Sequence, residues 1–390
     1  MSTLSANIPA RSRKDKLLPD SSRAFGCPQR YIQGPGEFRN VFVYGREYGN
    51  RFLFLLDPGI FDLMKAAIEA IEDRAGCSYE ILCYGGESSL EGAGELAEVV
   101  RTHDCNVIVG VGGGKILDTV KLVADLVDRP RIIAPTSASN DAPAADWAAI
   151  YTPEGEHIRG QRTRRSTELV LVDSEIIARA PARLFSAGIG DALATWFEAE
   201  ACEKAFTPNC VARGYRRTRA AMAVCRECHE ILMEDGVAAL KAVKAKVVTE
   251  ALENVIEANV LLSGLGFING GLAAGHGLHS GFSAAQGGES SLHGEKVAFA
   301  LLCQLVLENK PLEEIENIME FLYAVDLPVT LEQLGIACTP ENLAVIADKS
   351  VNKNLLVHNE PCAVNEEIIK NVIVMANALG HEFLSMKEEN

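Results

Sequence analysis

The chain has 390 residues, 48% of them hydrophobic, and its 53 acidic residues outnumber 37 basic ones, which leaves a net charge of −16. This length and composition predict two or three domains with large cores, and exclude a disordered chain. An acidic surface repels phosphate groups, so neither nucleic acid nor anionic membrane is an expected partner. Eleven scattered cysteines, an odd number, indicate reduced thiols in a cytoplasmic protein and exclude a disulfide scaffold.

The first 30 residues predict a flexible tail. Their basic side chains stand among serines and prolines, at Arg11, Arg13, Lys14, Lys16 and Arg23. No apolar stretch typical of a secretory signal is visible there. No apolar run in the whole sequence approaches the roughly 18 residues of a membrane helix.

Residues 31–180 alternate apolar strands with helical patterns. Strands are expected at 51–57, 79–84, 106–111 and 131–134, and helices at 60–73, 90–103 and 115–127. This alternation predicts a parallel sheet covered by helices on both faces. Two further strands, 148–151 and 168–173, flank a charged turn and suggest a hairpin that extends the sheet.

Beyond Pro181 nearly every segment has a helical period. Helices are expected at 191–205, 213–233, 237–260, 295–308, 312–324, 340–347 and 366–384. We therefore predict an α/β nucleotide-binding domain over residues 31–180 and an all-helical domain over residues 181–390. The cleft between two such domains is the expected place for a ligand.

A glycine-rich turn follows the strand at 106–111. Gly112, Gly113, Gly114 and Lys115 join this strand to the next helix, where backbone N–H groups can approach a pyrophosphate. The turn matches neither GxGxxG nor the Walker A pattern, and a plain tight turn is the alternative. Asp57 ends the strand at 51–57, where a carboxylate can accept both ribose hydroxyls of an adenosine and repel a 2′-phosphate. An ordinary turn aspartate before Pro58 is the alternative there.

A carboxylate and two histidines of the helical region form a candidate metal set. Asp191 stands where Gly188-Ile-Gly190-Asp191 opens a helix, and three of the eight histidines, His276, His279 and His293, fall close together. Two imidazole nitrogens and one carboxylate oxygen suit a divalent ion and leave a position open for substrate. Histidines of a core or a helix surface are the alternative.

Cys225-Arg-Glu-Cys228-His229 matches the pattern of covalent haem attachment. It falls within a predicted helix of a chain without a visible export signal. We therefore interpret it as a coincidence.

Five motifs in order resemble one known family. They are GVGGGKILDTVK (110–121), APTSASNDAP (134–143), APARLFSAGIGDALATWFEA (180–199), GGLAAGHGLHSG (270–281) and HGEKVAF (293–299). The chain resembles the glycerol dehydrogenases, the zinc-dependent polyol branch of the iron-containing alcohol dehydrogenases, from about Tyr31 to the C-terminus. The resemblance implies the dehydroquinate synthase-like fold, an α/β domain followed by an all-α domain.

The resemblance also implies roles for single residues. It places zinc on Asp191, His276 and His293, and a glycerol contact on Asp141. It places NAD contacts on Asp57, Gly114, Lys115, Asp118, Thr136, Ser139 and Tyr151, beside the glycines of the turn. The iron-dependent branch has a histidine where this chain has Thr195, which favours zinc. His279, one turn from His276, would support the metal ligands or relay a proton, or it packs without a role in catalysis.

The resemblance implies NAD-dependent oxidation of glycerol or a related vicinal diol to the hydroxyketone, dihydroxyacetone in the case of glycerol. The family implies a homo-oligomer, a dimer or an octamer. Asn140, Ala145, Asp146 and Trp147 depart from the family pattern beside the cofactor loop, and bear on which diol is preferred. Three alternatives stay open. A 2-hydroxy acid or 2-oxo acid dehydrogenase needs a cation for the substrate carboxylate. A dehydroquinate synthase-like lyase needs basic residues, and residues 251–300 offer only Lys296. A binding protein that has lost catalysis predicts degraded metal-ligand positions, and all three positions are intact here.

Overall fold

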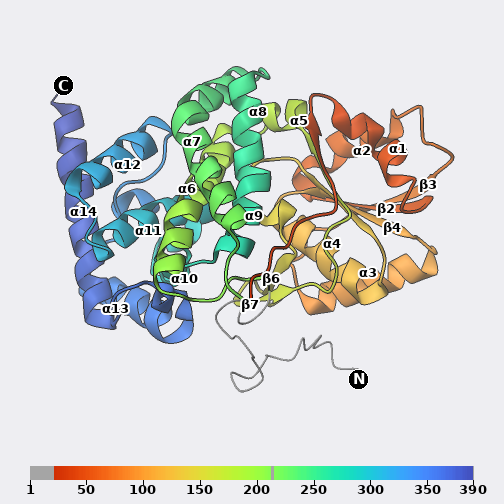
Figure 1. Cartoon of the computed structure of the whole chain (residues 1–390). Coiled ribbons are helices and arrows are strands. Elements are labelled where there is room, and N and C mark those ends of the chain that lie inside the picture. Colours follow the sequence, from red (N-terminus) through yellow and green to blue (C-terminus); the bar gives the residue numbers. More distant parts are fainter. Residues whose placement is uncertain (1–21, 212–214, 390) are drawn as a thin grey trace. The chain divides into compact units, whose positions relative to one another are not determined.

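The computed structural model describes residues 22–211 and 215–389, which form two compact units (Figure 1). The α/β unit comprises residues 26–181 and 242–264. The described residues of the helical unit are 22–25, 182–211, 215–241 and 265–389. Most of the predicted flexible tail lies outside the described residues. Within its last part, Arg23 forms a β-bridge with Arg216, and the Gln29 N–H donates to the Thr167 carbonyl at 2.8 Å.

A six-stranded parallel sheet with the order β1-β8-β5-β4-β2-β3 forms the centre of the α/β unit. Its strands are β1 (Tyr31–Gly34), β2 (Arg51–Leu56), β3 (Ser78–Cys83), β4 (Val107–Gly112), β5 (Arg131–Pro135) and β8 (Leu169–Asp173). Every residue of β4, β5 and β8 is buried, as in strands covered on both faces. The predicted parallel α/β architecture is therefore confirmed.

Helices lie on both faces of this sheet. Figure 1 shows α1 (Val41–Gly45) and α2 (Phe61–Glu69) on one side, and α3 (Leu90–Thr102) and α4 (Gly114–Val127) on the other. Successive side chains of β2 point to opposite faces of the sheet. The rings of Phe52 and Phe54 have their centroids 5.2 and 5.5 Å from that of Phe42 in α1. The short helix α5 (Ser174–Arg179) follows β8, with Asp173 as its N-cap.

The prediction that strands 148–151 and 168–173 form a hairpin that extends the sheet is wrong. Strand β6 (Trp147–Tyr151) pairs antiparallel with β7 (His157–Arg162), which lies inside the segment expected to be a turn. The two strands form a separate sheet. Strand β8 instead pairs in parallel with β1 and β5, because its five buried residues suit a central position. The charged side chains of β7 are mostly exposed, which hid its strand pattern.

Residues 242–264 were expected in the helical domain but group with the α/β unit. They contain α8 (Glu250–Glu257) and a π-helical turn, Ala258–Leu262. Gln33 Nε2 donates to the Glu253 carbonyl at 2.9 Å, and Asn259 Nδ2 to the Ala138 carbonyl at 3.1 Å. The continuous helical stretch Glu250–Gly270 is long and apolar enough to cross a membrane by composition. However, 67% of its most apolar window is buried inside the protein, as in the core helix of a soluble protein.

The helical unit is built from long helices: α6 (Ala182–Lys204), α7 (Arg219–Ala245), α9 (Ser263–Gly270), α10 (Ala274–Ala284), α11 (His293–Leu307), α12 (Leu312–Ala324), α13 (Pro340–Asp348) and α14 (Glu366–Glu388). Helices α7 and α9 each have an end in the α/β unit. The single helix expected over 237–260 is interrupted, because Lys246 has a positive φ of 58° and the Thr249 hydroxyl caps α8. Helix α6 begins at Ala182, so Asp191 lies inside it and does not open a helix as predicted.

Candidate active site

Asp191, His276 and His293 converge in the helical unit from three helices. His293 Nε2 lies 2.9 Å from Asp191 Oδ1, and His276 Nε2 lies 3.2 Å from the same oxygen. Among the described residues, this is the one group of three metal-binding side chains whose ligand atoms all lie within 4.8 Å of one another. Asp191 is fully buried, whereas the His293 side chain is 39% exposed. The cluster is therefore open to solvent on the His293 side.

Two glycines allow α6 and α11 to meet at this cluster. A Cβ atom on Gly190 would lie 2.5 Å from the Gly294 carbonyl oxygen, and one on Gly294 would lie 1.7 Å from the Ala187 carbonyl oxygen. The two helices therefore approach backbone to backbone. Asp191 follows the first glycine and His293 precedes the second, so this contact brings the two ligands together.

The Asp191 carboxylate and the neighbouring imidazoles shift one another's pKa values. Burial raises the pKa of Asp191, but His293 and His276 outweigh it and hold that pKa well below its usual value. Burial lowers the pKa of His276, but Glu198 and Asp191 raise it well above the ordinary range. The Asp191 carboxylate thus favours positive charge at the position between the two imidazoles. A divalent ion would supply that charge, and its binding would displace any hydrogen from the coordinating nitrogen.

The donor set fits a divalent transition ion. It offers one anionic oxygen and two imidazole nitrogens, fewer protein ligands than the four of a closed structural site. The Nε2 atoms of both histidines point at the same carboxylate oxygen, as they would toward a shared ion.

Two further residues contact the histidines. Glu198 Oε2 lies 2.6 Å from His276 Nδ1, and His279 Nε2 lies 3.0 Å from His293 Nδ1. The sequence predicts for His279 a supporting role, a proton relay or packing alone. In the structure His279 contacts His293, not His276, at the ring nitrogen that faces away from Asp191. Glu198 is not among the site residues predicted from the sequence. Its one available signal was the position two helical turns after Asp191, on the same face of α6.

The candidate cofactor residues meet at one edge of the parallel sheet. Asp57 follows β2, Gly112 ends β4 and is followed by Gly113 and Gly114, and Thr136 follows β5, so all stand at the carboxyl ends of adjacent strands. A Cβ on Gly112 would lie 3.0 Å from the Cβ of Asp57, and Gly113 faces open space. The Thr136 N–H donates to the Gly112 carbonyl at 3.1 Å. Ligands of open α/β sheets bind at this edge.

The remaining predicted cofactor residues lie in different settings. Lys115 forms an ion pair with Glu87, and its side chain is 62% exposed. Ser139 accepts from the Ser137 hydroxyl at 3.1 Å in the loop after β5. The Tyr151 ring packs on His157, with centroids 5.3 Å apart, and burial raises the pKa of Tyr151.

Asp118 has an internal role that its sequence position did not reveal. Its Oδ1 accepts from the buried Lys121 ammonium at 2.9 Å, and its Oδ2 accepts from the Ala149 N–H at 2.9 Å. Lys121 also donates to the carbonyls of Ala142 and Trp147 at 2.7 and 2.8 Å. The pair thus joins α4 to β6 and to the loop before it.

The predicted substrate residue Asp141 lies in the α/β unit and is buried. The Ser263 hydroxyl lies 3.4 Å from its Oδ2 atom. The neighbouring departures from the family pattern are structural. Asp146 pairs with Arg162 at 2.9 Å, and the Trp147 ring occupies the space beside Gly160, whose Cβ would lie 2.9 Å from it. The additional carboxylate of Asp146 is therefore neutralised within the β6–β7 sheet.

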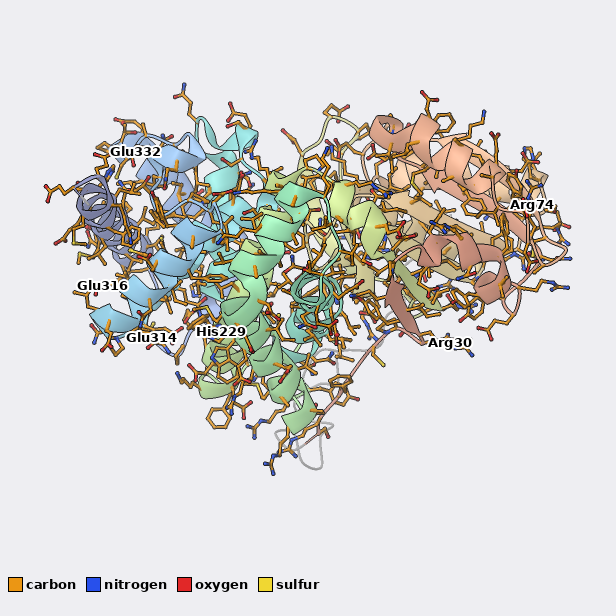
Figure 2. All side chains as sticks on the ribbon, turned by 90° about the horizontal axis from the view of Figure 1, so that it is seen from above. Arg30, Arg74, His229, Glu314, Glu316 and Glu332 are labelled. Carbon is orange, nitrogen blue, oxygen red and sulfur yellow. The ribbon has the colours of Figure 1, made fainter. Side chains whose placement is uncertain are left out.

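The haem-like motif has no access for haem. Cys225 and Cys228 are buried, and burial raises the pKa of Cys225 to about 12. The His229 ring instead packs edge-on against that of Phe197, with centroids 5.3 Å apart, and Figure 2 shows His229 and Glu314 near one another in the helical unit. These contacts support the interpretation of the motif as a coincidence.

Comparisons with known proteins assign the fold and the family. The family model "Iron-containing alcohol dehydrogenase" matches residues 28–174. The match covers most of the α/β unit and indicates the class of iron-containing alcohol dehydrogenases; the cluster of one aspartate and two histidines lies outside the matched residues. The crystal structure of glycerol dehydrogenase from Schizosaccharomyces pombe superimposes with a TM-score of 0.89 at 34% identity, over 94% of this chain and 93% of that one.

Sequence relatives narrow the class. A glycerol dehydrogenase of Escherichia coli is 41% identical over 93% of this chain and 98% of its own length. A glycolaldehyde reductase of Halobacterium salinarum is 36% identical over 91% of this chain and 97% of its own length. The chain belongs to the glycerol dehydrogenase family, as its motifs predicted.

Proposed function

We propose that this protein oxidises glycerol or a related vicinal diol to the hydroxyketone with NAD, at a zinc ion held by Asp191, His276 and His293. The convergence of these three side chains, in a chain of the glycerol dehydrogenase family, is the observation that carries the proposal. Zinc is proposed because the ligand set is one carboxylate and two imidazoles. Thr195 further favours zinc, since the iron-dependent branch has a histidine there.

Each group has a separate task. When bound, the metal supplies a Lewis acid that lowers the pKa of the alcohol, and NAD accepts the hydride. Asp191 would hold the ion with a buried anionic oxygen and offset part of its charge. His276 and His293 would each contribute a neutral imidazole nitrogen to the ion. The Gly112–Gly114 turn presents backbone N–H groups for the pyrophosphate of the cofactor.

Asp57 is proposed to select NAD. Its Oδ1 accepts from the Gly59 N–H at 2.8 Å, which orients the carboxylate at the end of β2. A carboxylate there accepts the hydroxyls of an adenosine ribose and repels a 2′-phosphate. Lys115, Asp118, Thr136, Ser139 and Tyr151 remain proposed contacts of the same cofactor.

Asp141 is proposed to orient the free hydroxyl of the substrate. A vicinal diol offers two oxygens to the metal, and glycerol offers a third to this carboxylate. Loss of a hydroxyl leaves a polar partner unsatisfied and costs about 1–3 kcal/mol, or a factor of about 5 to 150 in catalytic efficiency.

Initial rates of NADH formation with glycerol, 1,2-propanediol, 2,3-butanediol, ethanol and 1-propanol test this substrate class. All are measured at fixed NAD and zinc. We expect the best diol to exceed both monohydric alcohols by at least the lower of these factors. Ethanol or 1-propanol equal to the best diol in catalytic efficiency would contradict the polyol assignment.

A 2-hydroxy acid is the second candidate substrate, because the structure supplies a cation near the candidate metal site. Lys296 is buried one turn after His293, and its ammonium donates to the Ser283 hydroxyl at 3.1 Å. That hydroxyl lies 3.5 Å from His279 Nε2. A substrate carboxylate needs such a partner. If this candidate holds, Lys296→Met lowers the rate with lactate while sparing the rate with glycerol.

The location of the protein in the cell and its oligomeric state are also proposals. We propose a cytoplasmic homo-oligomer, a dimer or an octamer, that acts on a small soluble polyol. The net charge of −16 argues against binding to nucleic acid or to an anionic membrane.

A further inference from the structure

The Glu198 carboxylate contacts His276 at two points and the backbone of Ala273 at a third. Its Oε2 lies 2.6 Å from the ring atom Nδ1, and its Oε1 accepts from the His276 backbone N–H at 2.8 Å. The same Oε1 accepts from the Ala273 N–H at 2.8 Å. Glu198 has no solvent exposure, and a Cβ on Gly275 would lie 3.0 Å from its carboxyl carbon. The side chain therefore has little freedom to move.

Three buried side chains together hold the start of α10. The Ala274 N–H donates to Glu360 Oε1 at 2.8 Å, and the Gly275 N–H donates to Gln304 Oε1 at 2.9 Å. With the two bonds to Glu198, all four N–H groups from Ala273 to His276 have side-chain acceptors. A helix begins with N–H groups that lack intrahelical partners, so these acceptors complete the first turn of α10. Gln304 shows that an amide oxygen is sufficient for this capping.

The contact between Glu198 Oε2 and the imidazole has a different consequence. A carboxylate oxygen accepts hydrogen bonds, so His276 Nδ1 must carry the hydrogen. Nε2, which faces Asp191, is then the nitrogen left to bind a metal. His293 lacks such a partner, because its Nδ1 lies against the imidazole of His279.

We propose that Glu198 is a positioning residue that fixes the orientation and tautomer of His276 and thereby raises the affinity of the site for a divalent metal. This inference rests on the metal site proposed above. Partners behind a metal-binding histidine change metal affinity by about 10–100-fold.

Glu198→Gln separates this role from capping. The glutamine has the same size, and its Oε1 can still accept from the Ala273 and His276 N–H groups. Its amide nitrogen would then face Nδ1 as a donor, which forces the hydrogen onto Nε2 and opposes metal binding. Glu360→Gln is the matched control, because it changes a buried glutamate that caps the same helix start through the Ala274 N–H rather than through the imidazole.

The test is a titration of the metal-free full-length protein with Zn²⁺ against a competing chelating indicator. We expect Glu198→Gln to bind zinc about 10–100-fold more weakly than the parent, and Glu360→Gln to stay within about threefold. In a His276→Ala background, Glu198→Gln should cause no further loss, since Glu198 acts through that ring. Circular dichroism of the metal-free variants reports whether they fold.

The outcomes separate the two proposals. Three results would overturn the role of Glu198. They are a zinc affinity of Glu198→Gln equal to that of the parent, an equal loss of zinc affinity in Glu360→Gln, and a full further loss of zinc affinity when Glu198→Gln is added to His276→Ala. A parent protein that binds no zinc, or a His276→Ala variant that binds it unchanged, would instead overturn the metal site and this inference with it. If Glu198→Gln does not fold, Glu198→Asp is judged by the same criteria, because its shorter carboxylate cannot span both the ring and the backbone.

Discussion

A Cβ atom on Gly294 would lie 1.7 Å from the carbonyl oxygen of Ala187, so α11 touches the backbone of α6 at this point. The next residue toward the N-terminus is His293, whose Nε2 lies 2.9 Å from Asp191 Oδ1. Helix packing, rather than a local motif, therefore brings these two candidate ligands together from distant parts of the sequence.

Gly294→Ala should consequently damage both packing and metal binding. The added methyl group forces the helices apart, at a cost of at least about 1–3 kcal/mol in the free energy of unfolding. Thermal unfolding of the metal-free protein and zinc titration measure the two effects. Gly94→Ala in α3 is the control, because its Cβ would meet no atom within 4 Å. Equal behaviour of the two variants would refute the close contact.

Asp57→Ala tests the selection of the cofactor. Removal of the carboxylate abolishes both the ribose hydrogen bonds and the repulsion of a 2′-phosphate, so the preference for NAD over NADP should narrow. Catalytic efficiency with each cofactor gives the ratio. Asp62→Ala, an exposed change in α2, should leave it unaltered. A parent enzyme that uses both cofactors equally well would show that Asp57 does not contact the ribose.

Asp118→Ala should destabilise the α/β unit more than it weakens cofactor binding. The substitution leaves the Lys121 ammonium buried without its carboxylate partner, which typically costs about 3–5 kcal/mol. Urea unfolding measures the stability, and the KM for NAD measures the cofactor contact. The combined change Asp118→Ala with Lys121→Met should recover part of the stability. A variant of parent stability with a strongly raised KM would support the cofactor role alone.

Glu360 should make stability depend on pH. Burial raises its pKa to about 8, with Glu308 and Glu198 adding to the effect and Lys204 and the Ala274 N–H opposing it. Because the folded pKa exceeds the unfolded one, the protonated carboxyl favours the folded state at low pH, and this contribution declines as pH rises toward 8. The advantage of Glu360→Gln over the parent in melting temperature should therefore grow from pH 5 to pH 8.

Glu316→Gln is the control for that series. Glu316 lies exposed on α12 (Figure 2), and its removal should change the melting temperature by the same small amount at every pH. A Glu360→Gln profile parallel to that of the parent would contradict the raised pKa.

Much of the fold and part of the site could be predicted from the sequence. Apolar strands alternating with helices predicted the parallel sheet, and glycines after a strand predicted the turn at its carboxyl edge. The motifs around Asp191, His276 and His293 predicted the ligand set through their resemblance to a family. These signals are local in sequence or repeated with a regular period.

Features that depend on long-range packing could not be predicted. Glu198 looks like any acidic residue of a helix until α10 packs against it. The sequence around Asp118 does not show that Lys121, one helical turn away, is buried and pairs with it. Strand β7 is charged and exposed, and pairs only with β6, so its pattern resembled a turn.

The most direct test of the account is the rate of NADH formation from glycerol before chelation, after exhaustive chelation and after the return of zinc. We predict that chelation removes the activity of the parent and that zinc restores it. His293→Ala should stay inactive under all three conditions while remaining folded. His381→Ala, which changes an exposed histidine paired with Glu332, should behave as the parent. Full activity of the parent after complete removal of metal would contradict the proposed mechanism.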